Sequence, residues 1–218
     1  ERPAFLQQVI DNTTPSPDKA GAPFEIYVSA LDGSDIRRLT THAGFDSEIS
    51  VYPKTGALLF SAWHDKVFQL FIIPTPGTDP RPWIKSEFSD SEPAVSPRGN
   101  QVVWVRWSED RKKSAIWIAN FRGENAKELI NGDFFNINPT WTPDGEEIVF
   151  SSNRDSGKNF DIYSVKADGS CLKRQTSEKG DDLEPQIRPD GKELLFTSLK
   201  SGSKQLYILP WPMNTTCP

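Results

Sequence analysis

Histidine, cysteine and methionine are scarce in this chain of 218 residues, which holds two, two and one of them. The histidines are His42 and His64, and neither belongs to a Glu-x-x-His or paired-histidine motif. Because histidine zinc sites depend on such spacings, the sequence argues against a histidine zinc site. No stretch approaches 18 consecutive apolar residues, so we expect no transmembrane helix and no membrane insertion.

An excess of positive charge is also missing. Lys and Arg total 25 against 30 Asp and Glu, a formal net charge of −5, which argues against a nucleic-acid partner. The chain has no Gly-x-Ser-x-Gly motif, no phosphate-binding loop and no dinucleotide fingerprint. Neither a basic nor an apolar leader follows Glu1, so we expect that a signal peptide is absent or removed.

What the sequence does contain is a repeat, visible in three sets of anchors that stay in phase. The aligned prolines recur at spacings of 44, 46 and 46 residues: Pro53, Pro97, Pro143 and Pro189. An aromatic residue follows each proline by seven: Phe60, Trp104, Phe150 and Phe196. A second aromatic anchor recurs with similar spacing: Tyr27, Phe71, Trp117, Tyr163 and Tyr207. Glycines at 33, 77, 123 and 169 keep the same phase, so chance does not explain the pattern.

One repeat unit reads as short strands joined by tight turns. Residues 148–151 and 162–165 are rich in β-branched and aromatic residues, and the dipeptides 144–145 and 168–169 are Asp-Gly turns. Each unit of about 45 residues has room for four such strands, and no stretch shows sustained helical periodicity. The sequence therefore predicts an all-β fold, a β-propeller of about five four-stranded antiparallel blades around a central channel.

We expect residues 1–218 to form a single propeller domain. Its repeats lie near residues 1–41, 42–85, 86–131, 132–177 and 178–218, and residues 11–23 read as an exposed loop. The first and last repeats are incomplete. Residues 3–10 or 211–217 are candidates to complete a terminal blade; alternatively, the chain is part of a larger ring and leaves a sheet edge exposed.

The repeat resembles that of the TolB-like propellers, relatives of the WD-type repeat proteins. The best match is Pro-Thr-Trp-Thr-Pro-Asp-Gly at 139–145, followed by Ile-Val-Phe-Ser at 148–151, Ile-Tyr at 162–163 and Asp-Gly at 168–169. The resemblance covers roughly residues 24–209, although the copy at 48–84 lacks the Asp-Gly turn. It implies the fold and says little about activity, because propellers host many functions. In the TolB group the channel and one rim serve binding, which favours a binding role here.

A row of acidic and amide residues recurs in phase with the prolines. Asp or Asn stands seven residues before each proline: Asp46, Asp90, Asn136 and Asp182. Glu or Asn stands five before it: Glu48, Glu92, Asn138 and Glu184. The first strand of each propeller blade lines the channel, so these residues are expected at one channel mouth. There they would bind a basic partner segment, hold a calcium ion, or cap turns as a purely structural feature.

Three loop residues are a second candidate site. Trp63, His64 and Trp107 follow the predicted second strands, where an exposed aromatic platform would suit the C–H faces of sugar rings. The alternative is local packing between blades. The repeat positions of Trp104, Trp117 and Trp141 indicate core residues instead.

The two cysteines and two glycosylation motifs bear on the compartment. A bridge between Cys171 and Cys217 would close a loop of about 46 residues and stabilise the fold by roughly 3–4 kcal/mol. The alternative is two free thiols in a cytosolic protein. Asn-x-Thr motifs begin at Asn12 and Asn214. Together, an even number of cysteines and two such motifs favour a secreted or periplasmic glycoprotein.

These observations predict a non-enzymatic, secreted or periplasmic propeller that binds a protein or glycan ligand, lectin-like in the second case. The ligand would sit at the channel mouth or on the blade-top loops. The alternative is a metal-assisted lyase or hydrolase that uses the channel carboxylates. No cofactor is expected beyond a calcium ion in the channel, and the oligomeric state is not indicated.

Overall fold

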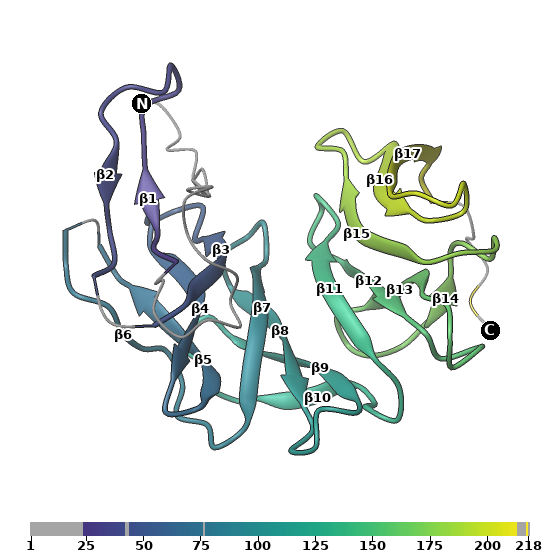
Figure 1. Ribbon diagram of the computed structural model, residues 1–218, viewed down its shortest axis with the longest axis horizontal. Coiled ribbons are helices and arrows are strands. Elements are labelled where there is room, and N and C mark those ends of the chain that lie inside the picture. The colour runs from purple at the N-terminus through teal and green to yellow at the C-terminus, as the bar shows by residue number, and fades with distance from the viewer. Residues whose placement is uncertain (1–23, 42–43, 76, 213–216, 218) are drawn as a thin grey trace. The chain divides into compact units, whose positions relative to one another are not determined.

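The chain folds into β-sheets throughout the part that the computed structural model describes, residues 24–41, 44–75, 77–212 and 217 (Figure 1). That part contains 17 strands and no helix, so it offers no helix that could cross a membrane. It divides into two compact units, residues 1–91 and 92–218. We describe each unit by itself.

The first unit holds two antiparallel sheets. One sheet has two strands, β1 (Tyr27–Val28) and β2 (Arg37–Arg38). The other has four strands in sequence order: β3 (Asp46–Val51), β4 (Leu58–His64), β5 (Val67–Ile73) and β6 (Arg81–Pro82). Ile26 joins Phe60 and Phe71 in a buried cluster, so the smaller sheet packs on one face of the larger.

The second unit holds three antiparallel sheets. The first contains β7 (Ser89–Val95), which begins in the first unit, β8 (Gln101–Trp107), β9 (Ser114–Asn120) and β10 (Lys127–Ile130). The next contains β11 (Asn136–Trp141), β12 (Glu147–Ser152), β13 (Asp161–Lys166) and β14 (Lys173–Arg174). The last contains only β15 (Asp182–Ile187), β16 (Glu193–Ser198) and β17 (Gln205–Pro210).

The repeated Asp-Gly turns produce the predicted hairpins. Between β11 and β12, the Gly145 amide donates to the Thr142 carbonyl at 2.8 Å, and Gly145 has a φ of 71°. Residues that carry a Cβ atom rarely adopt that backbone conformation, so glycine suits the position. The Thr142 hydroxyl donates to Asp144 at 2.6 Å, which fixes the turn further. The turn residues thus set the register in which β11 and β12 pair.

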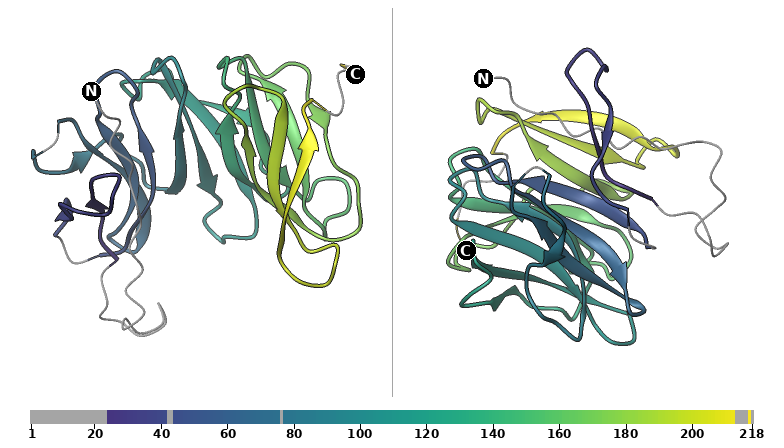
Figure 2. Two further views of the ribbon diagram at one scale, coloured as in Figure 1. Left: turned by 90° about the horizontal axis from the view of Figure 1, so that it is seen from above. Right: turned by 90° about the vertical axis from the view of Figure 1, so that its left-hand side faces the viewer.

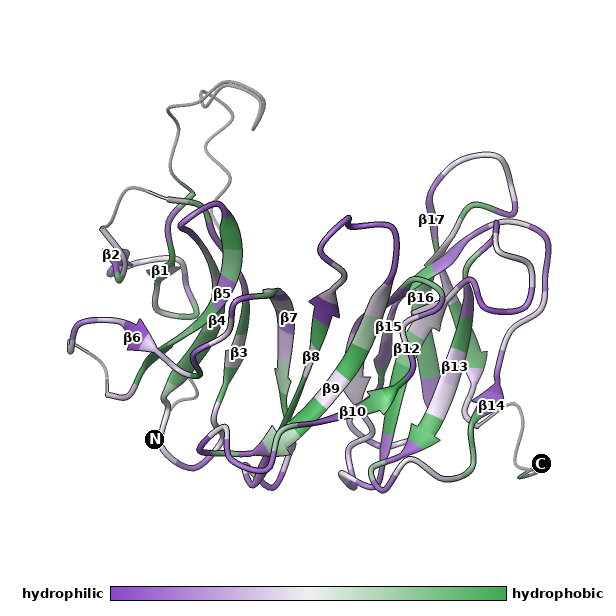
Figure 3. Ribbon diagram, turned by 90° about the horizontal axis from the view of Figure 1, so that it is seen from below, coloured by the Kyte–Doolittle hydropathy of each residue, from purple (hydrophilic) through white to green (hydrophobic). Residues whose placement is uncertain are grey.

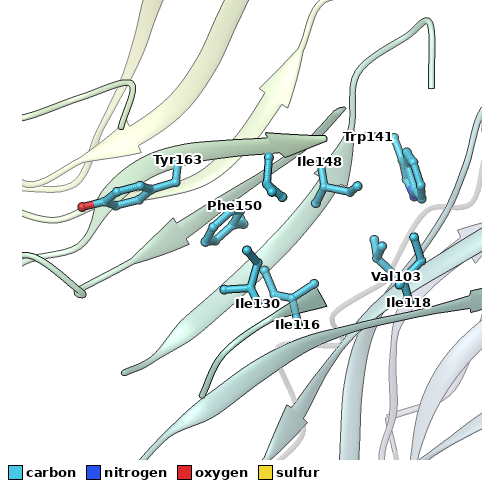
Figure 4. Packing of buried hydrophobic residues seen from close by; sticks show 9 residues of the cluster. Val103, Ile116, Ile118, Ile130, Trp141, Ile148, Phe150 and Tyr163 are labelled. Carbon is cyan, nitrogen blue, oxygen red and sulfur yellow. The ribbon is translucent and has the colours of Figure 1, made fainter. Parts of the chain in front are cut away.

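The middle sheet of the second unit is apolar on both faces, because both are covered. Phe150 and Tyr163 pack toward the β7–β10 sheet in one cluster (Figure 4), while Val149 and Ile162 pack toward β15–β17 in another. Figure 2 shows the β11–β14 and β15–β17 sheets face to face. The apolar residues concentrate in the middle strands of each sheet, whereas the connecting turns are polar (Figure 3). This explains why the strands read as continuous apolar runs rather than as an alternating pattern.

The predicted all-β architecture is confirmed, and so is the role of the repeat anchors. The aromatic residue seven after each proline is at most 2% exposed at all four positions: Phe60, Trp104, Phe150 and Phe196. Three of the five sheets have the four strands that we expected. Among the described residues the first sheet has two strands and the last has three, the two repeats that read as incomplete. Ring closure stays a prediction, and residues 1–23 lie outside the described part.

The predicted disulfide is present. Cys171 and Cys217 are bonded, with their Cα atoms 4.9 Å apart and a separation of 46 positions in the sequence. Cys171 lies in the turn before β14 and has a φ of 58°. The bridge therefore ties the C-terminal end of the chain to the outer hairpin of the β11–β14 sheet.

Replacing Phe150 with alanine is expected to lower the free energy of unfolding by about 3–5 kcal/mol. Phe150 is fully buried between two sheets, so its removal leaves a cavity that neither sheet can fill alone. Urea unfolding measures the loss. Phe121→Ala is the matched control, because Phe121 is 45% exposed and should change stability little. A loss below about 1 kcal/mol for Phe150→Ala would contradict the packing described above.

The bridge predicts that the unfolded, unreduced protein contains no titratable thiol. Cys171→Ser should lower the free energy of unfolding by roughly 3–4 kcal/mol, because it frees a loop of 46 residues in the unfolded chain. Thiol titration and urea unfolding test the two statements separately. Two free thiols per chain would show that the bridge does not form in the native protein.

Candidate functional site

The residues five before each proline share one backbone conformation. Their φ values lie between 52° and 56°, in the left-handed region: Glu48, Glu92, Asn138 and Glu184. Three of them lie where the pairing of first and second strands shifts register, between Ser47 and Ser50, Ile137 and Thr140, and Leu183 and Gln186. Such shifts are β-bulges, which re-aim a side chain away from the regular ladder.

In the second unit these side chains link one sheet to the next. The backbone amide of Asn138 and its Nδ2 both donate to Oε2 of Glu92, the second at 3.1 Å. Glu184 repeats the arrangement, since its backbone amide donates to Oδ1 of Asn138 at 3.3 Å. We call this chain of hydrogen bonds from Glu92 through Asn138 to Glu184 the first-strand ladder. Glu92 and Asn138 each accept the backbone amide of the equivalent residue 46 positions later.

Glu184 and Glu48 also make hydrogen bonds to side chains of the neighbouring strand or loop. Glu184 accepts the Thr197 hydroxyl at 3.1 Å and pairs with Lys204 at 2.8 Å. In the first unit, Glu48 accepts the Ser61 hydroxyl at 2.7 Å. In the second unit these residues therefore join neighbouring sheets, a structural role different from the turn capping considered from the sequence. Their service as a ligand site stays a prediction.

The residues seven before each proline are buried rather than presented to solvent. All four are at most 2% exposed: Asp46, Asp90, Asn136 and Asp182. Asn136 shows what the position does. Its Nδ2 donates to the carbonyls of Ser114 and Asn131 at 2.7 and 2.8 Å, and its Oδ1 accepts from Ser152 and Arg154, both at 2.8 Å. Asn136 thus fastens the loop from the preceding sheet to the start of its own.

A buried acid paired with arginine recurs in two repeats, and the sequence reasoning missed it. In the second unit, Arg174 of β14 pairs with Asp161 of β13 at 2.6 Å, and its Nε donates to the Thr176 carbonyl at 2.8 Å. In the first unit, Arg38 pairs with Glu25 and donates to the Thr40 carbonyl at 2.7 Å. The sequence did contain a sign of this repeat. Each of the three residues in the first unit stands 136 positions before its counterpart in the second, and 136 is the sum of the repeat spacings 44, 46 and 46.

Burial and hydrogen bonding shift the pKa values of these groups. Desolvation raises the pKa of Asp161 above its ordinary value, although the Arg174 guanidinium opposes the shift and nearby Asp182 adds to it. Hydrogen bonding to Glu25 raises the pKa of Arg38. Arg154 lies over the rings of Phe150 and Tyr163, at 5.6 and 5.3 Å from their centroids, and burial lowers its pKa. These charges are partners within the fold, and none is placed as an exposed acid–base pair.

The loop aromatics of the second unit form a row along one rim. The Trp107 ring centroid lies 6.1 Å from that of Phe135, which lies 6.4 Å from that of Phe160, so Phe135 is within contact range of both other rings. All three are half-buried, and the adjacent Phe134 is 38% exposed. We call these four residues the aromatic rim. Trp107 ends β8, and the other three lie in the loops that precede β11 and β13.

The first unit has a related aromatic row. The Trp63 ring lies 5.1 Å from Phe68, which lies 6.0 Å from Phe45, and Phe45 contacts Phe24 at 4.5 Å. Trp63 is half-buried at the end of β4, whereas the His64 side chain is 50% exposed and lies 3.3 Å from Asp65. The structure thus places Trp63 and Trp107 on equivalent strand ends, each beside a phenylalanine from a neighbouring segment.

The sequence also predicted a calcium site and two glycosylation positions. Within the described residues, no group of three or more His, Cys, Asp or Glu side chains is arranged to hold a metal ion. The calcium site stays a hypothesis without a ligand set on which to build it. The glycosylation positions Asn12 and Asn214 lie outside the described part of the chain.

Comparison with known proteins identifies the repeat. Residues 62–215 match the family described as the TolB beta propeller domain. A sequence comparison with curated proteins finds no match.

Three solved structures show the same fold at low sequence identity. A protein assigned as TolB from Agrobacterium tumefaciens is 20% identical, with a TM-score of 0.76 over 88% of this chain and 72% of its own. TolB from Acinetobacter baumannii is 18% identical, with a TM-score of 0.70 over 85% and 46%. An oligogalacturonate lyase in complex with manganese is 13% identical, with a TM-score of 0.66 over 86% and 56%. The chain thus spans about half the length of the last two.

The first-strand ladder predicts that Asn138→Asp destabilises the protein by about 1–3 kcal/mol at pH 7. The variant loses the Nδ2 donor and sets a carboxylate beside that of Glu92. Like charges at short range disfavour ionisation of both groups, so the loss should shrink as the pH falls toward 4 and the carboxylates take up protons.

Urea unfolding at the two pH values measures this effect. Asn125→Asp is the matched control, because Asn125 has a similar φ of 56° but lies exposed in a turn. Equal losses for both variants would show that backbone conformation alone, and not the ladder, explains the effect.

Proposed function

Because the chain belongs to the family of TolB beta propeller domains, we propose that it is an extracytoplasmic binding protein without catalytic activity of its own. The ligand that the geometry favours is a protein, bound on the aromatic rim. The single observation that supports this choice is the row of Trp107, Phe135 and Phe160 next to exposed Phe134.

An aromatic row of this kind is suited to a protein interface. Interface cores are enriched in aromatic side chains, which provide large contact areas and lose little conformational entropy. The rings support one another within the rim, so a partner would meet a surface that is already ordered. Lys113 and Asp133, paired at 3.3 Å, lie in the adjoining loops and supply the polar surroundings typical of such a core.

The extracytoplasmic location is supported by the disulfide between Cys171 and Cys217. Disulfides persist in the periplasm and outside the cell, whereas cytosolic thiols are kept reduced. The two Asn-x-Thr motifs are compatible with secretion but do not distinguish it from a periplasmic location.

The catalytic alternative has less support from the described residues. A metal-assisted lyase would need converging oxygen ligands, yet the first-strand oxygens of the second unit accept backbone and side-chain donors within the fold. The similarity to a manganese-bound lyase is too low to transfer its activity. Glycan binding would use the same aromatic surface, and the glycan array described below distinguishes it from protein binding.

The test starts from ligand capture by the immobilised, oxidised protein from the extracytoplasmic fraction of the cells that produce it. Captured proteins are identified by mass spectrometry, purified and titrated against the chain. Phe134→Ala is expected to weaken the affinity at least about tenfold, since truncation of an interface aromatic typically costs more than 1 kcal/mol. Its stability should be unchanged, because Phe134 is 38% exposed.

Phe121→Ala is the matched control, since Phe121 is similarly exposed at 45% but lies in the turn between β9 and β10. A ligand that binds Phe134→Ala and the parent protein equally would move the site away from the rim. Binding on a glycan array that Phe134→Ala abolishes would replace the protein ligand by a glycan. Turnover of a candidate polysaccharide would overturn the non-enzymatic proposal.

A further inference from the structure

The loop between β10 and β11 contains a chemically reactive dipeptide. Asn131 is the only asparagine of the chain that is followed by glycine, and it is exposed. An asparagine side chain can react with the backbone nitrogen of the next residue, and glycine favours this reaction because no Cβ shields the nitrogen. The loop joins two sheets of the second unit, and Phe134, the exposed member of the aromatic rim, lies in it.

The contacts of the loop leave both reacting groups available. Within the described residues, neither the backbone amide of Gly132 nor the Nδ2 group of Asn131 donates to an acceptor. Oδ1 of Asn131 accepts the backbone amide of Asp133 at 2.9 Å. The ring closed by this hydrogen bond contains both Cγ of Asn131 and the nitrogen of Gly132. Negative charge develops on Oδ1 when the nitrogen attacks Cγ, and a donor at this distance stabilises that charge.

The packing of the loop also explains why glycine follows Asn131. A Cβ at position 132 would lie 3.2 Å from the Cβ of Ala115 and 3.4 Å from its backbone nitrogen. Contacts this short would force the loop or strand β9 to move. The close approach of the loop to β9 therefore calls for glycine, and the same glycine leaves its nitrogen open to reaction.

The reaction needs only the chain and one water molecule. The Gly132 nitrogen forms a bond to Cγ of Asn131, and its proton leaves with the Nδ2 group as ammonia. The product is a five-membered cyclic imide that water then opens. Opening at Cγ gives aspartate, whereas opening at the main-chain carbonyl leaves Cγ bonded to the Gly132 nitrogen and gives isoaspartate. No electron is transferred in either route, so no oxidant or reductant is required.

Isoaspartate would disturb a loop that is fixed on both sides. Ile130 is 5% exposed at the end of β10, and the carbonyl of Phe134 accepts the Ser114 amide at 2.9 Å. Between these points, the carbonyl of Asn131 accepts Nδ2 of Asn136 at 2.8 Å. Isoaspartate adds one methylene to the main chain of this short span and turns that carbonyl into a free carboxylate. The added length must be taken up by residues 131–134, which include the exposed phenylalanine of the rim.

We propose that Asn131 and Gly132 form a self-modifying site, at which conversion to isoaspartate rearranges the loop that carries Phe134. The product also adds one negative charge to a loop that already contains Asp133. The conversion and the rearrangement of the loop are independent of the ligand. The further consequence, weaker ligand binding on the aromatic rim, rests on the proposed function.

The first experiment follows the conversion in the folded, oxidised chain by peptide mass mapping during incubation at pH 7 and pH 8.5. Asn125 is the internal control, because it is exposed in a turn but precedes alanine, and within the described residues its side-chain oxygen has no donor. The Asn131 peptide is expected to convert at least about tenfold faster than the Asn125 peptide. Its rate should rise with pH, because the attacking nitrogen must lose its proton. Conversion of Asn131 no faster than that of Asn125 overturns the proposal.

The second experiment compares the purified isoaspartyl form with the parent chain by hydrogen exchange. The backbone amides of residues 131–136 are expected to exchange faster in the isoaspartyl form, because the hydrogen bond between Asn136 and the Asn131 carbonyl is lost. Freshly purified Asn131→Asp is the matched control, since it adds the charge without lengthening the main chain and should exchange like the parent. Asn131→Gln keeps a neutral amide and should resist conversion. An isoaspartyl form with unchanged exchange overturns the rearrangement of the loop.

The captured ligand provides the last readout. The isoaspartyl form is expected to bind it about tenfold more weakly than the parent chain, comparable to the loss of an interface aromatic. Equal affinity of the two forms, with Phe134→Ala still impaired, overturns the effect on the rim. A failure of the proposed function gives a different result, because Phe134→Ala and the isoaspartyl form would then both bind like the parent while the conversion and the faster exchange remain.

Discussion

The β11–β14 sheet is covered on both faces, and most other features of the second unit follow from that constraint. A strand with one solvated face alternates apolar and polar residues, whereas β12 must bury Ile148, Val149 and Phe150 in succession. Its odd and even positions serve different neighbours, because Phe150 packs toward β7–β10 and Val149 toward β15–β17. The sheet cannot offer either face to a ligand. Its loops and strand ends are the parts that can contact a ligand.

The same constraint explains why the polar residues on the first strands are hydrogen-bonded within the fold. A buried acceptor without a partner costs free energy, so carboxylates and amides at these positions need donors from within the fold. The β-bulges make the supply possible, since the left-handed backbone at Asn138 and Glu184 turns their amides toward the preceding sheet. Asn136 and the Arg174–Asp161 pair satisfy further groups at the strand ends. The row of residues that the sequence places at a channel mouth joins sheets in this unit, and its use as a ligand site stays a prediction.

The sequence predicted the elements well because the repeat anchors depend on local chemistry. Asp144-Gly145 specifies its turn within a few residues, and Phe150 marks a buried strand whichever sheet covers it. The disulfide was also foreseen, since only one pairing of two cysteines exists. The first-strand ladder was not foreseen, because its donors and acceptors are 46 residues apart and its geometry depends on a bulge. One clue was present: Asn138, which can donate and accept, stands between two residues that mainly accept.

The aromatic rim and the exposed side of β17 differ in chemistry. The rim offers flat rings among charged loop residues, the combination of an aromatic centre and polar surroundings that is typical of protein interfaces. Strand β17 instead exposes the aliphatic side chains of Leu206 and Ile208, which carry no polar group to orient a small ligand. The two surfaces lie on different elements, β17 on the one hand and the loops preceding β11 and β13 on the other. Ligand binding at the rim therefore does not require the exposed side chains of β17.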